Sequence, residues 1–374
     1  MERWGTGLLR LSPLPLLLTG ALVTAPVVLT GLAALSPAPE GTTLKGAEHE
    51  VELRIAAVGD IMLGGSSEPV LHATGYDYPF VHMRKFLQDS HIVFGNLEGP
   101  LTDRGEAVRD KKYVFRSPPE KVVPALQAAG FTVLSLANNH ILDYGVEGLE
   151  QTMEVLKVAG IHPAGAGRDL AEARRPALVK GGGRTVAFLA YSLTLPESFY
   201  AEPDRPGTAF GHEHHVRADV AQARRQADLV IVSFHWGREL ETTLRDYQPR
   251  LGHAAIDAGA SVVFGHHPHI LQGIERYKHG VILYSLGNFT FGSYSKSVTR
   301  SAIAQLLFRG NRLRQLRMIP INVNNIELNF QPLPLSGRDA DAVIEDLHRL
   351  SLAQGATLEN QAGVGVLVFP DGDQ

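Results

Sequence analysis

A layered α/β fold with a largely buried sheet is predicted by three features of this 374-residue sequence. Short apolar runs alternate with helical patterns along the chain, as they do where helices cover a sheet. Polar side chains collect at the points where several of these runs end. The composition, 44% apolar and 20% charged, is ordinary for a globular protein and excludes a wholly disordered or fibrous chain.

The apolar runs are predicted to be strands because each is short and closes at turn-forming or polar residues. They are Val51–Val58, Ile92–Phe94, Val133–Leu136, Val186–Ala190, Leu229–Phe234, Ser261–Phe264 and Val281–Tyr284. Helices are predicted between several of them, at Pro118–Ala129, Val146–Ala159, Val216–Gln226 and Gln248–Ala258. This alternation is the basis of the α/β prediction.

The pattern changes after Ser301, where successive antiparallel strands are expected. These are Ala302–Phe308, Leu313–Ile321 and Glu327–Pro332, followed by a helix at Asp339–Gln354 and a last strand at Gly365–Phe369. No internal repeat or low-complexity tract interrupts the chain. We therefore expect one α/β domain over residues 51–374.

The N-terminal segment differs from the rest, because no charged side chain occurs from Leu11 to Pro39. A stretch of this length can cross a hydrocarbon layer, which needs about 20 apolar residues. The two arginines before it favour a cytoplasmic N-terminus. We predict a cytoplasmic tip and signal anchor over residues 1–38, a linker over 39–50, and a single-pass membrane protein whose C-terminal domain is extracytoplasmic, in the periplasm or at the cell surface. A cleaved signal peptide is the alternative, since small residues at positions 34–38 offer cleavage sites.

Cysteine content and net charge exclude several classes of function. The chain has no cysteine, which rules out disulfides, cysteine-based zinc sites, iron–sulfur clusters and thiol nucleophiles. Its formal charge of −4, without any block of like charges, gives no electrostatic footprint for nucleic acid, so no nucleic-acid partner is expected. The 16 histidines are the unusual feature, and several of them cluster.

Candidate functional residues follow five of the predicted strands at their carboxyl ends, where ligands bind in open α/β sheets. These residues are Asp60, Asn96, Glu98, Asn139, His140, His235, His267 and His269. Taken singly, an aspartate after a strand is usually a turn residue or a helix cap, and a lone asparagine or histidine usually has a loop or packing role. Together they supply carboxylate and imidazole groups, which suit zinc, manganese or iron. We therefore predict a site for divalent metal ions.

Six segments contain or extend these clusters: AVGDIMLG (57–64), FGNLEGPLT (94–102), LSLANNHILDYG (134–145), VSFHWGREL (232–240), FGHHPHILQGIE (264–275) and YSLGNFTFG (284–292). In this order they resemble the CapA family, the poly-γ-glutamate capsule synthesis proteins, within the calcineurin-like metallophosphoesterase superfamily. The resemblance implies a four-layer αββα sandwich of metallophosphoesterase type and a dinuclear metal centre. It also implies a membrane-anchored protein needed to make or export a polymer of glutamate.

The resemblance assigns a role to each strand-end residue. Metal ligands are implied at Asp60, Asn96, Glu98, Asn139, His235, His267 and His269. Departures from the superfamily pattern are Met62 in place of the histidine of Asp-x-His, Asn96 in place of a bridging aspartate, and an additional His266. A proton donor to a leaving oxygen is implied at His140. Asp143 is expected to orient His140, or else to cap the helix predicted from Val146.

Two segments and one strand end are expected to bind substrate or support the ligands. The segment Thr102–Pro119 carries several cations, of which Lys112 and Arg116 are expected to receive phosphate or polyglutamate carboxylates; the alternative is a solvated hairpin. The long segment Thr194–His215 is rich in proline and aromatic residues, which is typical of a functional loop. Asn288 is expected to line the substrate site and to hold a neighbouring ligand through a hydrogen bond.

These observations support three hypotheses of function. The first is an anchored, metal-dependent hydrolase-like subunit in the synthesis or export of poly-γ-glutamate or a related envelope polymer, with partners in a membrane synthase complex. The second is a non-catalytic scaffold of such a complex, and the third is an extracytoplasmic metallophosphoesterase. The expected cofactors are two divalent ions of manganese, iron or zinc, and the expected ligand is an anionic polymer or a phosphorylated substrate.

Overall fold

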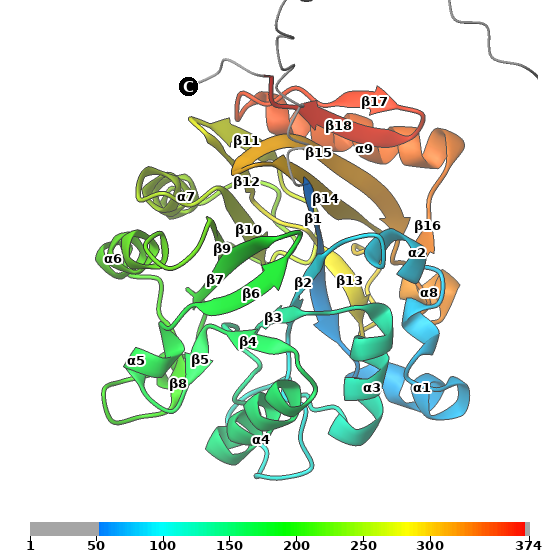
Figure 1. Cartoon of the computed structure of the whole chain (residues 1–374). Coiled ribbons are helices and arrows are strands. Elements are labelled where there is room, and N and C mark those ends of the chain that lie inside the picture. The colour runs from blue at the N-terminus through cyan, green and yellow to red at the C-terminus, as the bar shows by residue number, and fades with distance from the viewer. Residues whose placement is uncertain (1–51, 371–374) are drawn as a thin grey trace, which may run out of the picture. The chain divides into compact units, whose positions relative to one another are not determined.

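The computed structural model describes residues 52–370, which are built on two main β-sheets (Figure 1). The larger sheet has ten strands, eight of them in the order β17 (Glu359–Gln361), β18 (Val364–Val368), β15 (Arg312–Asn322), β14 (Arg300–Arg309), β1 (Glu52–Met62), β2 (Ile92–Leu97), β3 (Val133–Ser135) and β4 (His162–Ala164). β13 (Asn288–Phe291) also pairs with β1, and β16 (Leu333–Pro334) with β15. The pairs made by β1 with β2 and β13 are parallel, whereas β14 and β15 are antiparallel.

The smaller sheet has six strands and a central parallel part. Its order is β11 (Ile274–Tyr277), β12 (Gly280–Leu283), β10 (Val262–His266), β9 (Leu229–His235), β7 (Arg184–Ser192) and β6 (Ala177–Gly181). From β12 to β7 the pairing is parallel, and β11 and β6 run antiparallel at the two edges. A short ladder of β5 (Ala166–Gly167) and β8 (Gly207–Thr208) lies apart from both sheets.

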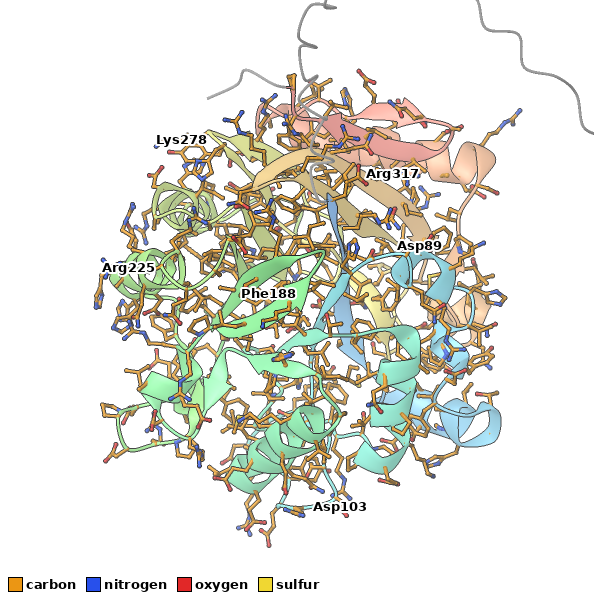
Figure 2. The ribbon with its side chains drawn as sticks, in the orientation of Figure 1. Asp89, Asp103, Phe188, Arg225, Lys278 and Arg317 are labelled. Atoms are coloured by element: carbon orange, nitrogen blue, oxygen red, sulfur yellow. The ribbon has the colours of Figure 1, made fainter. Side chains whose placement is uncertain are left out.

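The two sheets share one apolar core. Alternate residues of both sheets contribute to it, because side chains along a strand point to opposite faces in turn. Phe94 of β2 lies 5.7 Å from Phe188 of β7 and 5.2 Å from Phe264 of β10, measured between ring centroids. Figure 2 places Phe188 within the body of the domain and Asp103 and Arg225 at its edge. Burial between the sheets therefore holds the layers together.

Helices cover the outer face of each sheet. The larger sheet is covered by α1 (Glu68–Thr74), α2 (Arg84–Leu87), α3 (Pro119–Ala129) and α4 (Gly145–Val158), whose apolar residues form a second core. The smaller sheet is covered by α6 (Glu213–Ala223) and α7 (Tyr247–Asp257), which form a third. The amphipathic α9 (Gly337–Leu352) contacts β15, β18 and β11. The described residues thus form a mixed α/β structure in which helices flank two facing sheets.

The predicted alternation of strands and helices is confirmed, but one predicted strand is wrong. Residues 327–332 were expected to pair, whereas the chain forms a helical turn, α8 (Asn325–Leu328), and reaches β15 only through β16. The side chain of Asn324 accepts a hydrogen bond from the Ile326 amide and starts the turn. Asn329 then adopts a left-handed conformation with φ 49°, which ends it.

The predicted anchor (1–38) and linker (39–50) lie outside the described residues. Within residues 52–370, none of the helices combines the length and the apolar composition that crossing a membrane requires.

Candidate metal centre

The carboxyl ends of strands from both sheets meet at one site. Within the larger sheet, Asp60 at the end of β1 pairs with Asn96 of β2 on one side and Asn288 of β13 on the other. Within the smaller sheet, His235 of β9 pairs with His266 of β10. Parallel pairing thus brings residues that are far apart in sequence to the same edge of each sheet.

Six side chains form three overlapping sets of metal-ligand type. The sets are Asp60, Glu98 and His269; Glu98, His235 and His267; and Glu239, His267 and His269. Within each set, the candidate ligand atoms lie within 4.8 Å of one another. Five of the six residues were singled out from the sequence. Glu239 was not, because it follows β9 on an exposed loop, although it lies within the VSFHWGREL segment.

Asp60 is the most heavily contacted carboxylate of the centre. It is fully buried, and Oδ2 accepts from the His267 amide at 3.3 Å and lies 3.1 Å from His269 Nδ1. His266 Nδ1 lies 3.2 Å from Oδ1, without the geometry of a hydrogen bond. Burial acts to raise the pKa of Asp60, but the imidazoles of His266 and His269 hold this pKa well below its ordinary value. Asp60 is therefore ionised and available to a cation.

Asn96 faces the centre with its amide nitrogen. Nδ2 lies 2.9 Å from Asp60 Oδ1 and 3.3 Å from both Glu98 Oε2 and His235 Nδ1. The amide oxygen instead accepts from Asn138 Nδ2 at 3.2 Å. In this arrangement Asn96 donates hydrogen bonds to the ligand-type groups around it.

Asn138 fixes that orientation. Its Nδ2 donates to the Leu97 carbonyl at 2.8 Å, and its Oδ1 accepts from the His140 amide at 3.1 Å. These two backbone partners fix the orientation of the Asn138 amide. Because Asn138 Nδ2 also donates to Asn96 Oδ1, the orientation of the Asn96 amide is fixed as well. The role of Asn138 was not predicted, although the Asn138-Asn139-His140 run marks the strand end on which it lies.

Within the three ligand sets, two buried atoms have no hydrogen-bond partner among the described residues. They are Glu98 Oε1 and His267 Nδ1, which belong to the same set of candidate ligands. Buried polar atoms are normally paired, so both atoms indicate a missing partner. Burial and the neighbouring Asp60 raise the pKa of Glu98 well above its ordinary value. A cation between these atoms would satisfy both.

The protonation of two of the three ligand-type histidines also fits a divalent ion. Burial and the neighbouring His267 keep the pKa of His235 well below its usual range, and burial and His269 lower the pKa of His267 to about 3. Both are therefore neutral, which is the form that coordinates metals. For His269, burial is outweighed by Glu98 and Asp60, and its pKa rises to about 9. The donor set of carboxylates and imidazoles suits zinc, manganese or iron.

Two predicted residues orient ligand-type histidines. Asn139 Oδ1 lies 2.7 Å from His235 Nε2, and Asn288 Oδ1 lies 2.9 Å from His269 Nδ1. Asn139 is thus near enough to share a ligand site with His235. Contacts of this kind fix the ring orientation of a metal-binding histidine.

His140 and Asp143 form a pair beside this cluster. His140 Nδ1 lies 2.7 Å from Asp143 Oδ2, which also accepts from the Phe115 amide at 2.8 Å. Burial lowers the pKa of His140 against the opposing effect of Asp143. Asp143 does not cap α4, because Tyr144 occupies the capping position and provides no side-chain hydrogen bond.

Lys111 contacts both members of this pair, a role that its place among the cations of segment 102–119 did not predict. Its ammonium contacts the Asn139 carbonyl and Asp143 Oδ1, and lies 3.0 Å from His140 Nδ1. It also lies 5.3 Å from the ring centroid of Phe199. Segment 102–119 contains several cations, and only the folded structure distinguishes the one that turns inward.

Lys112 and Arg116, the predicted substrate cations of this segment, lie outside the cluster. Both are exposed, with Lys112 Nζ 4.9 Å from the Tyr113 ring centroid and the Arg116 guanidinium 4.5 Å from that of Tyr144. Neither cation contacts a ligand-type residue, and no strand of the described structure lies within the segment. Their predicted part in substrate binding stays a prediction.

Comparison with known proteins gives a consistent set of similarities. The sequence model of the bacterial capsule synthesis protein family PGA_cap matches residues 54–293. The chain is 35% identical to the capsule biosynthesis protein CapA of Bacillus anthracis, over 75% of this chain and 69% of that protein. It is 32% identical to the PGA biosynthesis protein CapA of Bacillus subtilis (strain 168), over 81% and 80%.

A solved structure is similar at a lower level. It is a putative 5'-nucleotidase from Staphylococcus aureus in complex with α-ketoglutarate, at 13% identity and a TM-score of 0.46. The match covers 80% of this chain and 58% of that one. Similarity at this level does not assign an activity.

Proposed function

Because the chain belongs to the bacterial capsule synthesis protein family PGA_cap, we propose that it acts in the synthesis or export of poly-γ-glutamate or a related envelope polymer through a metal-dependent, hydrolase-type centre. One observation carries the metal-dependent part. Glu98 Oε1 and His267 Nδ1 are buried without a hydrogen-bond partner in the described part of the chain, and they lie with His235 in a set of metal-ligand type.

The metal would be held by the carboxylates and imidazoles of both sheets. Asp60, Glu98 and His269 form one set and Glu98, His235 and His267 another, so two ions sharing Glu98 are proposed. Manganese, iron or zinc suits these donors. When bound, such ions lower the pKa of a water and polarise a phosphoryl or carbonyl group.

The remaining residues position groups and move a proton. His140 makes no hydrogen bond through Nε2 with any described residue, so this atom is free to exchange a proton with a substrate oxygen. Asp143 holds the opposite ring nitrogen, and Lys111 balances the Asp143 charge. Lys112 and Arg116, exposed on the neighbouring segment, are proposed to attract an anionic polymer.

We also propose that residues 1–38 anchor the chain in the cell membrane. The described domain would then lie outside the cytoplasm, where an envelope polymer is assembled. The proposed partners are the other subunits of a membrane synthase or export complex.

Metal analysis and polymer output test this function together. Full-length protein purified under metal-replete conditions should contain stoichiometric divalent metal, and His235→Ala should lower that content while leaving the fold intact. In cells that depend on this chain, His140→Ala and His140→Gln should keep the metal but abolish polymer production. Absence of metal from the wild-type protein would contradict the proposed centre.

A non-catalytic scaffold is the second candidate, and one observation favours it. Asn96 occupies the position at which a metal-bridging aspartate is expected in the related phosphoesterases. Its side chain presents an N–H donor, not a carboxylate oxygen, to Asp60 and Glu98. A scaffold predicts normal polymer output from His140→Gln, since that substitution leaves the surface almost unchanged.

A further inference from the structure

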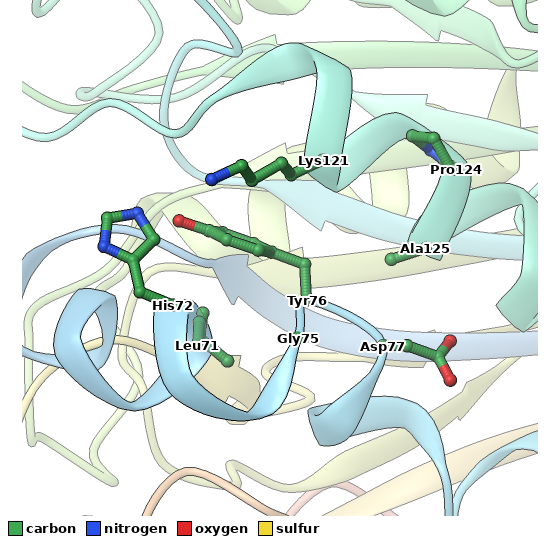
Figure 3. A pocket seen from close by; sticks show the side chains of 8 residues that line it. All are labelled: Leu71, His72, Gly75, Tyr76, Asp77, Lys121, Pro124 and Ala125. Carbon is green, nitrogen blue, oxygen red and sulfur yellow. The ribbon is translucent and has the colours of Figure 1, made fainter.

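A cavity of about 470 Å³ lies between α1 and α3, on the outer layer of the larger sheet (Figure 3). Leu71, Pro124 and Ala125 give it an apolar wall. The ends of Lys121, His72 and Tyr76 gather at one side of it, as Figure 3 shows. None of these residues belongs to the candidate metal centre, so the cavity is a separate feature of the domain.

The hydroxyl of Tyr76 is an unpaired donor in this cavity. Tyr76 is 5% exposed, and its hydroxyl is buried without a hydrogen-bond partner among the described residues. Lys121 Nζ lies 6.0 Å from its ring centroid, and the His72 ring lies 5.9 Å away. Both of these side chains are exposed, and binding at the buried hydroxyl would require them to turn aside. An oxygen acceptor would satisfy the hydroxyl and meet the Lys121 charge.

The charges around the hydroxyl limit what that acceptor can be. Asp77 points away from the other polar ends in Figure 3 and forms an ion pair with Arg84. Burial raises the pKa of Tyr76, and so do Glu68 and Glu120, which keeps the hydroxyl protonated as a donor. The same two glutamates would repel a phosphate dianion more strongly than a single carboxylate. A carboxylate on a partly apolar chain therefore fits better.

The cavity is connected to the metal centre by one continuous segment. Lys111 contacts Asp143 beside the centre, Lys112 and Arg116 are exposed further along, and Lys121 reaches the cavity from the first half of α3. Cations thus recur along the stretch of chain that leaves the centre and leads into the cavity, which is the charge that a polyanion of several repeating units would meet.

We propose that this cavity binds one glutamyl unit of a γ-linked glutamate polymer whose neighbouring units extend toward the metal centre. The unit's carboxylate would accept hydrogen bonds from Tyr76 and Lys121, and its methylene groups would pack on Leu71, Pro124 and Ala125. The identity of the polymer rests on the proposed function, but the binding itself needs neither the metal nor catalysis.

Binding of a fluorescent γ-glutamyl oligomer tests the proposal. The full-length chain would be held in detergent with EDTA, and affinity measured by fluorescence anisotropy. Tyr76→Phe, which removes only the unpaired hydroxyl, and Lys121→Met should each weaken binding by roughly tenfold, as expected for loss of a hydrogen bond to a charged group. Lys85→Met is the matched control, because Lys85 is also a helical lysine that lies over an aromatic ring, and it should bind as the wild type does.

The outcomes separate this proposal from the proposed function. Because binding is measured in EDTA, it does not depend on the metal that the proposed function requires. Wild-type affinity in Tyr76→Phe, no binding by the wild type, or equal competition by inorganic phosphate would each overturn the polymer site. Oligomer binding that depends on Tyr76 would support it even if the protein proved to hold no metal.

Discussion

Asn96 limits the negative charge that the centre holds. Its amide donates to Asp60 and Glu98, two buried carboxylates that would otherwise repel each other across a short distance. A carboxylate in its place would increase the charge available to metal ions, but it would leave three buried acids together. The amide is therefore a compromise between metal affinity and the stability of the metal-free chain.

Asn96→Asp should lower the stability of the metal-free chain and raise its affinity for metal. In EDTA, we expect the variant to lose roughly 2 kcal/mol of unfolding free energy, because a donor to Asp60 becomes a repelling acceptor. Added manganese or zinc should restore stability, and metal affinity should exceed that of the wild type. Denaturant unfolding with and without metal measures both effects.

Asn288→Asp is the matched control for that substitution. Asn288 already presents an oxygen to His269 at 2.9 Å, so a carboxylate there keeps an acceptor beside a cationic ring. It should cost less stability in EDTA than Asn96→Asp does, because no donor to Asp60 is lost. Equal losses in the two variants would contradict the role given to the Asn96 amide.

Lys111 offers a second test at a single side chain. It pairs with Asp143, which is fully buried, while the lysine side chain is itself 16% exposed. Lys111→Met leaves a buried carboxylate without its cation, so we expect a loss of about 3 kcal/mol in urea unfolding. Lys112→Met changes the adjacent, exposed lysine and should stay within about 0.5 kcal/mol of the wild type. Similar values for the two variants would show that Lys111 is not the partner of Asp143.

The helices and strands that could be predicted are those with a clear apolar pattern in their own residues. Elements that form only by pairing with a distant segment of the chain were missed. Buried runs such as β9 and β10 are continuous apolar stretches, and they occur where expected. β13 was not predicted, because it is four residues long and exists by pairing with β1, more than 200 residues earlier in the chain. Residues 327–332 alternate polar and apolar side chains as a strand does, but the capping asparagine before them takes the chain into a turn instead.

The same distinction applies to the site. Asp60, His235 and His269 could be predicted, because strand ends in an α/β fold converge by topology. Lys111 and Glu239 could not, because their positions depend on irregular segments whose paths are set by side-chain packing and single hydrogen bonds. Sequence pattern therefore finds the ligands carried by strands before it finds the groups carried by loops.

The short helix α5 (Leu170–Ala173) gives a prediction for acid stability. Burial opposes ionisation of Glu172, but hydrogen bonds from Arg168 and the charge of Lys157 on α4 lower its pKa to about 2. A lowered pKa means that the carboxylate stabilises the fold above pH 4.5 and that this contribution is lost as the pH falls toward 2.

Glu172→Gln should therefore be less stable than the wild type at pH 7, and the difference should shrink as the pH approaches 2. Urea unfolding at pH 7, 4 and 3 measures that trend. A gap that stays constant over this range would show that the ion pairs of Glu172 do not hold α5 against α4.

At the scale of the whole domain, the two sheets pack against each other through their shared core, and the candidate metal centre lies where their carboxyl ends meet. Asp60 and Glu98 come from the larger sheet, while His235 and His267 come from the smaller one. A bound ion would therefore link the sheets directly. Because such a site forms only when both sheets are in place, the free energy of metal binding adds to the free energy of folding.

Metal removal should accordingly lower the stability of the domain. At metal concentrations about 100 to 1,000 times the dissociation constant, the stabilisation expected from binding to the folded state alone is about 3–4 kcal/mol, so thermal unfolding should occur at a clearly higher temperature in manganese or zinc than in EDTA. His267→Ala should abolish most of that difference, since His267 belongs to two of the three candidate ligand sets. His162→Ala, which changes an exposed histidine on β4, should keep it. If the unfolding temperature of the wild type were the same with metal and with EDTA, the centre would not link the sheets, and the histidines at the strand ends would need another explanation.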